Sequence, residues 1–302
     1  MQSDIFLNRL YKYSKERFNL IQFIPLCLII AGFLGVSTQL YLKQEININL
    51  IFISSIVFLL FLLRLRIFDE FKDDDHDKKH YPNRPISRGL LSLNELGILL
   101  YPVIFLEFIF ALYSGKLTLI LFGVSFIYSL VMFKEFFISE WLREHFSIYI
   151  FLHEILVIPL FFYLCSINGF VFKYEHIFYF INLVVCASFF MFLLEIARKV
   201  RSKENEIASK DTYTAQYGIL GASIILVIIS IISKITLIIN FELLKGGFLI
   251  ISIISILSFL YLLFDIYIFC KNKTSHKAKK VFGSSIIFSF VNLLASIVLS
   301  II

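Results

Sequence analysis

Long apolar runs dominate the pattern of hydrophobic and polar positions along the chain. The runs are about 20 residues long, which is the length of a helix that crosses a bilayer. They lack the two-residue alternation of barrel strands, and helices are the other structure that satisfies its own backbone hydrogen bonds in lipid. The pattern therefore predicts an all-α polytopic membrane protein. Its nine transmembrane helices are expected near residues 18–42, 47–68, 94–113, 117–137, 147–168, 175–197, 217–239, 246–270 and 281–302.

The domain organisation follows from these spans. Residues 1–302 are predicted to form a single transmembrane domain, and nothing in the chain resembles a cleavable signal peptide. Residues 1–17 mix polar and apolar side chains, which is typical of a segment that lies along the membrane surface. The four cysteines have no paired spacing, so we expect small buried side chains and neither disulfides nor a metal site.

The placement of positive charge predicts the orientation. With the N-terminus in the cytoplasm, 23 of the 28 Lys and Arg residues fall on the cytoplasmic side. The opposite side keeps the other five, which are Lys43, Lys116, Lys173, Lys234 and Lys245. This asymmetry follows the positive-inside rule and explains the basic residues without nucleic-acid binding. Compact loops suit a bacterial inner membrane.

Carboxylates cluster after the second predicted span. If the helix continues past Phe68, then Asp69, Asp73 and Asp77 lie on one face at positions i, i+4 and i+8, bordered by Glu70. Like charges at this spacing repel unless cations lie between them. Hard oxygen ligands suit Mg²⁺, which is often shared between a few carboxylates and a substrate phosphate. The alternative is a solvated acidic loop.

A second charged cluster follows the sixth predicted span. Glu195, Ser202 and Glu206 would share a helical face at i, i+7 and i+11, and Arg198 and Arg201 stand between them. Carboxylates surrounded by Arg and Lys can hold a Mg²⁺–diphosphate. The carboxylates bind the metal, and each guanidinium group can donate two parallel hydrogen bonds to phosphate oxygens. The alternative is a charged cytoplasmic loop that obeys the positive-inside rule.

Four ionisable residues are predicted inside the membrane: Glu107, His153, Glu154 and Asp265. Such groups are costly in hydrocarbon, so each is a candidate functional residue. The alternative is hydrogen bonding between helices or a water-lined crevice. Three prolines within the spans could also bend helices around a cavity, or serve packing alone: Pro25, Pro102 and Pro159.

The first loop resembles the UbiA-type intramembrane prenyltransferases, whose first motif is N-D-x-x-D-x-x-x-D. Asp69, Glu70, Asp73 and Asp77 fill that frame, with Asp in place of Asn and Glu in place of the first Asp. The family's R-P-x-x-S/R-G signature is matched by Arg84-Pro85-Ile86-Ser87-Arg88-Gly89. The family's second aspartate-rich motif falls on Glu195 to Glu206, where Ser202 replaces a carboxylate.

The resemblance implies a UbiA-like bundle and Mg²⁺-dependent transfer of a prenyl group from a prenyl diphosphate to a small acceptor, aromatic by analogy, within the lipid bilayer. It implies two sets of residues around the metal and the diphosphate. Metal would be held by Asp69, Glu70, Asp73, Asp77, Glu195 and Glu206, and the diphosphate by Arg66, Arg84, Arg198 and Arg201. Glu107 or Glu154 would take the acceptor's proton. The matching clusters also predict two quasi-equivalent four-helix halves.

The rival function is a secondary transporter or ion carrier that uses Glu107, His153 and Glu154 as a site in the middle of the membrane. Against it, the densest carboxylates lie at the membrane surface, and no span is interrupted by Gly and Pro together.

Overall fold

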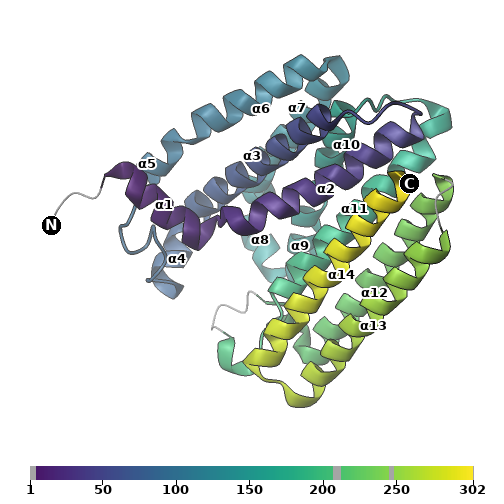
Figure 1. The fold of residues 1–302 in the computed structure, drawn as a ribbon. Helices are drawn as coiled ribbons and strands as arrows, with labels where there is room; N and C mark the ends of the chain where they lie inside the picture. Colours follow the sequence, from purple (N-terminus) through teal and green to yellow (C-terminus); the bar gives the residue numbers. More distant parts are fainter. Residues whose placement is uncertain (1–4, 207–211, 245–247, 302) are drawn as a thin grey trace. The chain divides into compact units, whose positions relative to one another are not determined.

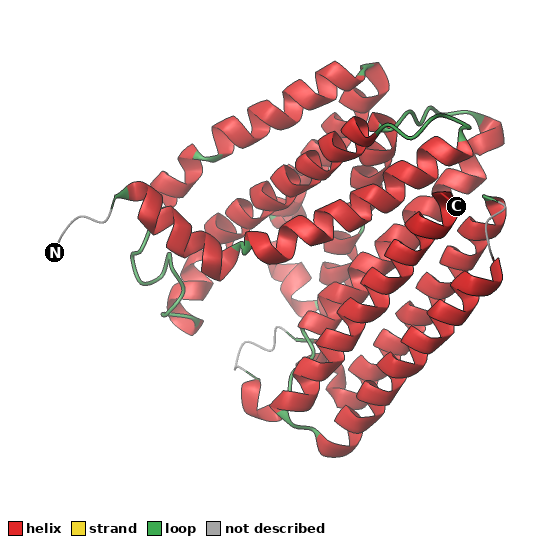
Figure 2. Ribbon diagram, viewed as in Figure 1, coloured by secondary structure: helices red, strands yellow, loops and turns green. Residues whose placement is uncertain are grey.

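The computed structural model describes residues 5–206, 212–244 and 248–301, and all regular structure within them is helical (Figure 2). Within these described ranges, nine stretches are long and apolar enough to cross a membrane, which confirms the predicted number of spans. Their bounds are Leu20–Tyr41, Ile48–Lys72, Leu93–Ser114, Lys116–Phe133, Phe146–Ile167, Tyr174–Arg198, Tyr213–Leu243, Ile250–Asn272 and Ser275–Ile301. Residues 245 and 246, at the junction before the eighth span, lie outside the described residues.

The individual helices follow the chain in a simple order (Figure 1). The first part of the chain contains α1 (Phe6–Arg17), α2 (Leu20–Tyr41), α3 (Ile48–Lys72), α4 (Asp74–His80), α5 (Leu93–Ile98), α6 (Leu100–Ser114) and α7 (Lys116–Phe133). After a short 3₁₀ turn, η1 (Glu135–Phe137), come α8 (Ser139–Glu144), α9 (Phe146–Glu154), α10 (Val157–Ile167) and α11 (Tyr174–Arg198). A second turn, η2 (Lys203–Asn205), precedes α12 (Tyr213–Leu243), α13 (Phe248–Asn272) and α14 (Ser275–Ile301).

Two of the three intramembrane prolines coincide with interruptions of a span. The third span breaks at Leu99, just before Pro102, and the fifth breaks between Glu154 and Val157, just before Pro159. Proline lacks an N–H and its ring crowds the carbonyl four residues earlier, so the break falls upstream of the ring. Pro25 lies within α2 without dividing it. Pro102 and Pro159 thus follow interruptions in their spans, and bending of the helices around a cavity stays a prediction.

The chain divides into two compact units, each of which contains four complete spans. Unit 1 consists of Met1–Ala31 and Ile48–Asn168, and unit 2 of Gly32–Asn47 and Gly169–Ile302. Within unit 1, α3 packs on α6 and α7 packs on α10; within unit 2, α11 packs on α12 and α13 packs on α14. The first span is shared by both units. This division agrees with the two four-helix halves expected from the sequence, while a single domain over residues 1–302 stays a prediction.

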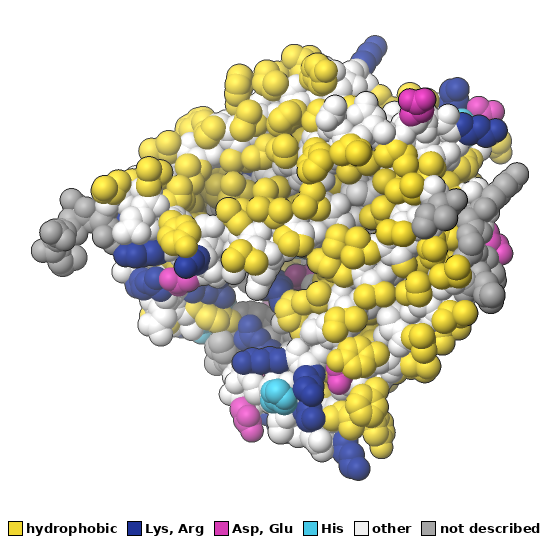
Figure 3. Space-filling model, in the orientation of Figure 1, with side chains coloured by type: hydrophobic (Ala, Val, Ile, Leu, Met, Phe, Trp, Pro, Cys, Tyr) yellow, Lys and Arg dark blue, Asp and Glu magenta, His cyan; other side chains and the backbone are white. Residues whose placement is uncertain are grey.

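Apolar side chains cover the long sides of the helices, and charged side chains gather near the helix ends (Figure 3). Many large apolar side chains are exposed within the spans, among them Phe105, Ile127 and Leu257. Lipid is the solvent in which such exposure carries no cost. Three cysteines are buried and Cys270 is half-buried, as expected for small apolar side chains.

Candidate active site

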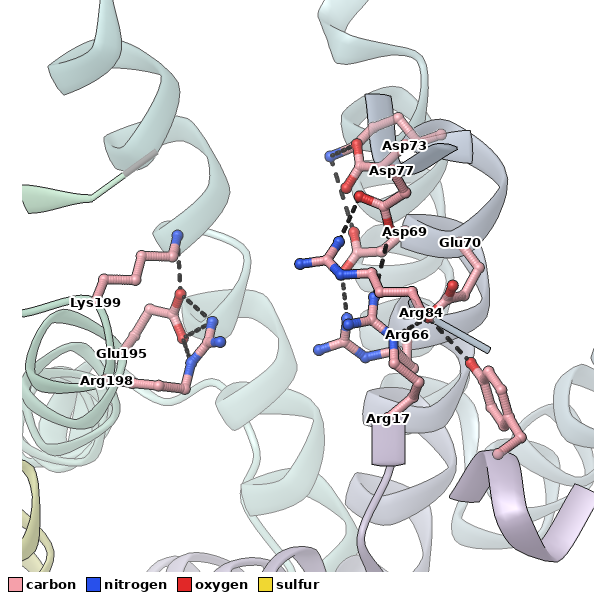
Figure 4. A network of polar contacts seen from close by, with 12 residues as sticks. Arg17, Arg66, Asp69, Glu70, Asp73, Asp77, Arg84, Glu195, Arg198 and Lys199 are labelled. Carbon is pink, nitrogen blue, oxygen red and sulfur yellow. Dashed lines mark hydrogen bonds and ion pairs between the residues drawn. The ribbon is translucent and has the colours of Figure 1, made fainter. Parts of the chain in front are cut away.

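The three aspartates of the first cluster lie at the junction of two helices. Helix α3 ends at Lys72 and α4 begins at Asp74, and two backbone hydrogen bonds of α-helical spacing cross the break through Asp73. The N–H of Asp73 donates to the carbonyl of Asp69 at 2.9 Å, and the N–H of Asp77 donates to the carbonyl of Asp73 at 2.7 Å. Figure 4 shows Asp69, Asp73 and Asp77 gathered on one side of this junction, with Asp77 between the other two in this view, and the three are called the aspartate column below.

Basic side chains lie against each of these aspartates. The Lys72 ammonium is 3.8 Å from Asp69 and 4.0 Å from Asp73, and its Nζ donates to the Tyr149 hydroxyl at 3.3 Å. A guanidinium nitrogen of Arg66 is 3.8 Å from Asp69. Arg84 bonds to Asp77 and places its guanidinium 3.7 Å from the centre of the Tyr81 ring.

Asp73 is half-buried, and its negative charge is the least neutralised by nearby basic groups among the three aspartates. Burial raises the pKa of its carboxyl to about 6, against the lowering effect of the Lys72 ammonium, and the neighbouring Asp69 and Asp77 carboxylates raise it further. A cation added beside Asp73 would relieve this repulsion. Among the described residues no three Asp, Glu, His or Cys side chains converge as a preformed cage. Mg²⁺ commonly takes one or two carboxylates and completes its octahedron with water and phosphate oxygens, so this donor set fits it.

Glu70 points away from the aspartates and toward α1 (Figure 4). Its side chain is 2% exposed, and its Oε1 accepts hydrogen bonds from Arg17 Nε at 2.6 Å and from the Tyr13 hydroxyl at 3.3 Å. Burial and the Glu70 charge raise the pKa of Tyr13, which keeps the phenol protonated as a donor. Sequence reasoning missed Arg17 and Tyr13, because nothing local in the sequence pairs them with a residue more than fifty positions away.

Glu107 forms a buried ion pair inside the membrane-spanning part of unit 1. Arg64 Nε donates to Glu107 Oε2 at 2.7 Å, Arg64 also donates to the Ser129 hydroxyl, and both charged side chains are fully buried. The Arg64 guanidinium is surrounded by aromatic rings, with its carbon 4.7 Å from the centre of Phe61. Sequence reasoning had counted Arg64 only as one of the basic residues on the cytoplasmic side, although a carboxylate within a span predicts a cation within another span. A role for Glu107 as proton acceptor stays a prediction.

His153 and Glu154 lie at the interruption of the fifth span. Glu154 is the last residue of α9, and both side chains are half-buried. The His153 ring lies 4.0 Å from the ring of Tyr149, centre to centre, and Tyr149 accepts the hydrogen bond from Lys72. A series of contacts within unit 1 thus connects the aspartates with the residue next to Glu154.

The second cluster, in unit 2, departs from its predicted form. Helix α11 ends at Arg198, so Glu195, Ser202 and Glu206 do not share a helical face, and that expectation was wrong. Glu195 accepts hydrogen bonds from Arg198 Nε at 3.1 Å and from Arg198 Nη2 at 2.8 and 2.9 Å, and it lies 3.0 Å from Lys199 Nζ (Figure 4). Basic side chains at a helix C-terminus are stabilised by the helix dipole. Arg198 and Lys199 therefore favour the end of α11 at this point.

Several polar groups of the loop after α11 contact one another. The Glu206 carboxylate accepts hydrogen bonds from the hydroxyls of Thr212, at 2.6 Å, and Thr214, at 2.5 Å. The backbone N–H of Arg201 donates to the Thr214 hydroxyl at 3.0 Å. Ser202, which stands where the family motif has a carboxylate, is completely buried. Lys210 and Asp211 lie outside the described residues. Metal binding by Glu195 and Glu206 stays a prediction.

These features define a helical integral membrane protein with clustered carboxylates at the ends of its spans. No protein-family model matches the sequence, and no curated protein matches it either. Two solved structures share the fold. A UbiA homologue from Aeropyrum pernix K1 has a TM-score of 0.68 at 13% identity, covering 92% of this chain and 99% of that one. A structure concerned with digeranylgeranylglyceryl phosphate synthase in membranes has a TM-score of 0.64 at 18% identity, covering 97% and 99%. The chain therefore has the fold of the UbiA-type prenyltransferases, which confirms the resemblance at the level of fold.

Proposed function

We propose that this protein transfers a prenyl group from a prenyl diphosphate to an acceptor within the membrane, and that the transfer depends on Mg²⁺. The observation that carries the proposal is the column of Asp69, Asp73 and Asp77 at the end of a membrane-spanning helix, in a chain with a prenyltransferase fold. A column of like charges at this spacing is unfavourable by itself, which supports a cationic ligand.

The roles proposed for the protein's own groups follow from their chemistry. Asp69, Asp73 and Asp77 would hold Mg²⁺, whose positive charge would favour departure of the diphosphate. Arg66 and Arg84, which lie beside the column, would bind diphosphate oxygens and stabilise the negative charge that develops there. In unit 2, Arg198 and Arg201 remain candidates for the same task, although Arg198 is already paired with Glu195.

Release of diphosphate tests the reaction type. Purified protein in lipid, given labelled prenyl diphosphates of several chain lengths and a panel of acceptors, is expected to release diphosphate only with Mg²⁺ and an acceptor present. Release that is equal with and without chelator would contradict the metal dependence. A secondary transporter, the rival function, would release no diphosphate.

The proposal includes a topology, in which both carboxylate clusters face the cytoplasm. We expect cysteines introduced by His76→Cys and Asn205→Cys to react with an impermeant thiol reagent from the same side of the membrane. The native cysteines are replaced by serine first, because Cys270 is only half-buried. Labelling of the two positions from opposite sides would exclude this topology.

Glu154 is the better placed of the two candidate proton acceptors, because Glu107 is already paired with Arg64. We expect Glu154→Gln to lower turnover more than it lowers binding of the diphosphate, since proton removal follows diphosphate binding. The matched control is Glu140→Gln, an exposed carboxylate in α8. Unchanged turnover in a well-folded Glu154→Gln protein would assign that residue to packing.

A further inference from the structure

The N-terminal helix α1 pairs through Arg17 with the buried Glu70, the residue that follows Asp69. Glu70 follows Asp69 in the chain but directs its carboxylate to the opposite side, where Arg17 and Tyr13 donate to the same oxygen. Tyr13 and Glu70 are each 2% exposed. Turning this buried carboxylate toward a metal would break both hydrogen bonds and separate Glu70 from Arg17.

Arg17 also contacts the last aspartate of the column. Its Nη2 lies 3.8 Å from Asp77 Oδ2, while Arg84 holds the other carboxylate oxygen. The Asp77 side chain is 7% exposed and lies between these two guanidinium groups. Arg17 thus bridges Glu70 and Asp77 and limits the directions in which the Asp77 carboxylate can point.

Other contacts hold α1 in place without touching the aspartates. Arg9 pairs with Glu95 at 2.5 Å, and Arg88 pairs with Glu16 at 2.6 Å. An apolar cluster lies beneath the helix, and its members come from α1, α3 and the segment between α4 and α6: Tyr13, Phe6, Leu10, Ile67, Leu91 and Leu96. These contacts provide the matched controls, because they anchor the same helix at a distance from the column.

We propose that Glu70 is an anchor for Arg17 and not a metal ligand, and that Arg17 is a positioning residue that orients Asp77 in the metal site. The N-terminal helix is then a structural part of that site. The inference rests on the proposed function, and it gives Glu70 a role different from the one that the family resemblance implies. It also gives a physical reason for Glu at a position where the family motif has Asp, since the longer side chain reaches the helix.

Binding of Mn²⁺ by the purified full-length protein, followed by loss of the free-ion paramagnetic signal, separates these roles. Mn²⁺ takes carboxylate and water oxygens as Mg²⁺ does. We expect Asp73→Asn to lower affinity by roughly 100-fold or more. Glu70→Gln and Arg17→Gln should each lower it by about tenfold, as for residues that orient a ligand. The double variant should be no worse than either single one, because the two residues act as a unit.

Two control variants separate positioning from simple loosening of α1. Arg17→Lys, which keeps the charge, should recover most of the affinity, and Arg9→Gln should leave Mn²⁺ binding unchanged while lowering thermal stability. Glu70→Gln as damaging as Asp73→Asn would overturn the inference while leaving the proposed function standing, as would Arg17→Gln with wild-type affinity. Absence of Mn²⁺ binding by the wild-type protein, with and without inorganic diphosphate, would overturn both.

Discussion

Asp73→Ala is expected to abolish Mg²⁺-dependent binding of a prenyl diphosphate, a loss of roughly 100-fold or more, while leaving the fold intact. Asp73 belongs to the aspartate column, and the side-chain contact that the structure shows for it is a 4.0 Å approach to Lys72. Its carboxylate is therefore available for a cation, and its removal breaks no buried pair. Asp77, which is held by Arg17 and Arg84, gives a less clean test.

The neighbouring aspartates are the matched controls. Asp74 pairs with Lys78 at 2.6 Å along α4, and Asp75 is exposed. Asp74→Ala and Asp75→Ala should therefore change diphosphate binding much less than Asp73→Ala. A calorimetric titration of the purified variants compares them. Equal loss across the aspartates would indicate a diffuse acidic patch, and equal retention would mean that this loop does not hold the metal.

Loss of either partner of the Arg64–Glu107 pair is expected to destabilise the protein by about 3–5 kcal/mol, because it leaves a single charge buried among aromatic rings. Arg64→Leu and Glu107→Leu should therefore unfold at lower denaturant concentration than the wild type. The double variant should recover much of the loss, since neither charge then remains. Arg9→Leu, which breaks a partly exposed pair, should cost about 1 kcal/mol or less.

Reversible unfolding in mixed micelles, followed by circular dichroism, measures these differences. Single variants as stable as the wild type would contradict the structural role of the pair. Glu107→Gln separates that role from catalysis, because the amide oxygen can still accept a hydrogen bond from Arg64. A Glu107→Gln protein that is stable but inactive would restore Glu107 as a proton acceptor.

The spans could be predicted from the sequence because an apolar run of bilayer length has few other structures open to it. The proximity of the three aspartates could also be predicted, since i, i+4 and i+8 spacing is local, but the break between α3 and α4 at Asp73 could not. The same reasoning failed for Ser202 and Glu206. Their spacing carries meaning only if the helix continues, and α11 ends at Arg198.

The ion pairs were beyond local reasoning for a different reason. Arg17 with Glu70 and Arg64 with Glu107 join distant segments, and each partner has a plausible role of its own when the sequence is read by itself. The resemblance to a family motif even favoured a metal-binding role for Glu70. Burial distinguishes a metal ligand from a structural ion pair. The Glu70 carboxylate is 2% exposed and its charge is already neutralised by Arg17.

Mass spectrometry of the lipid products tests the central claim most directly. The wild-type protein in lipid is incubated with Mg²⁺, a labelled prenyl diphosphate and a panel of acceptors, with Asp73→Ala and a chelator as controls. The account predicts a new product whose mass equals that of one acceptor plus the labelled prenyl group, less one proton, and which is absent from both controls. Wild-type protein that binds Mg²⁺ and the prenyl diphosphate but forms no joined product with any acceptor would contradict the assignment as a prenyltransferase.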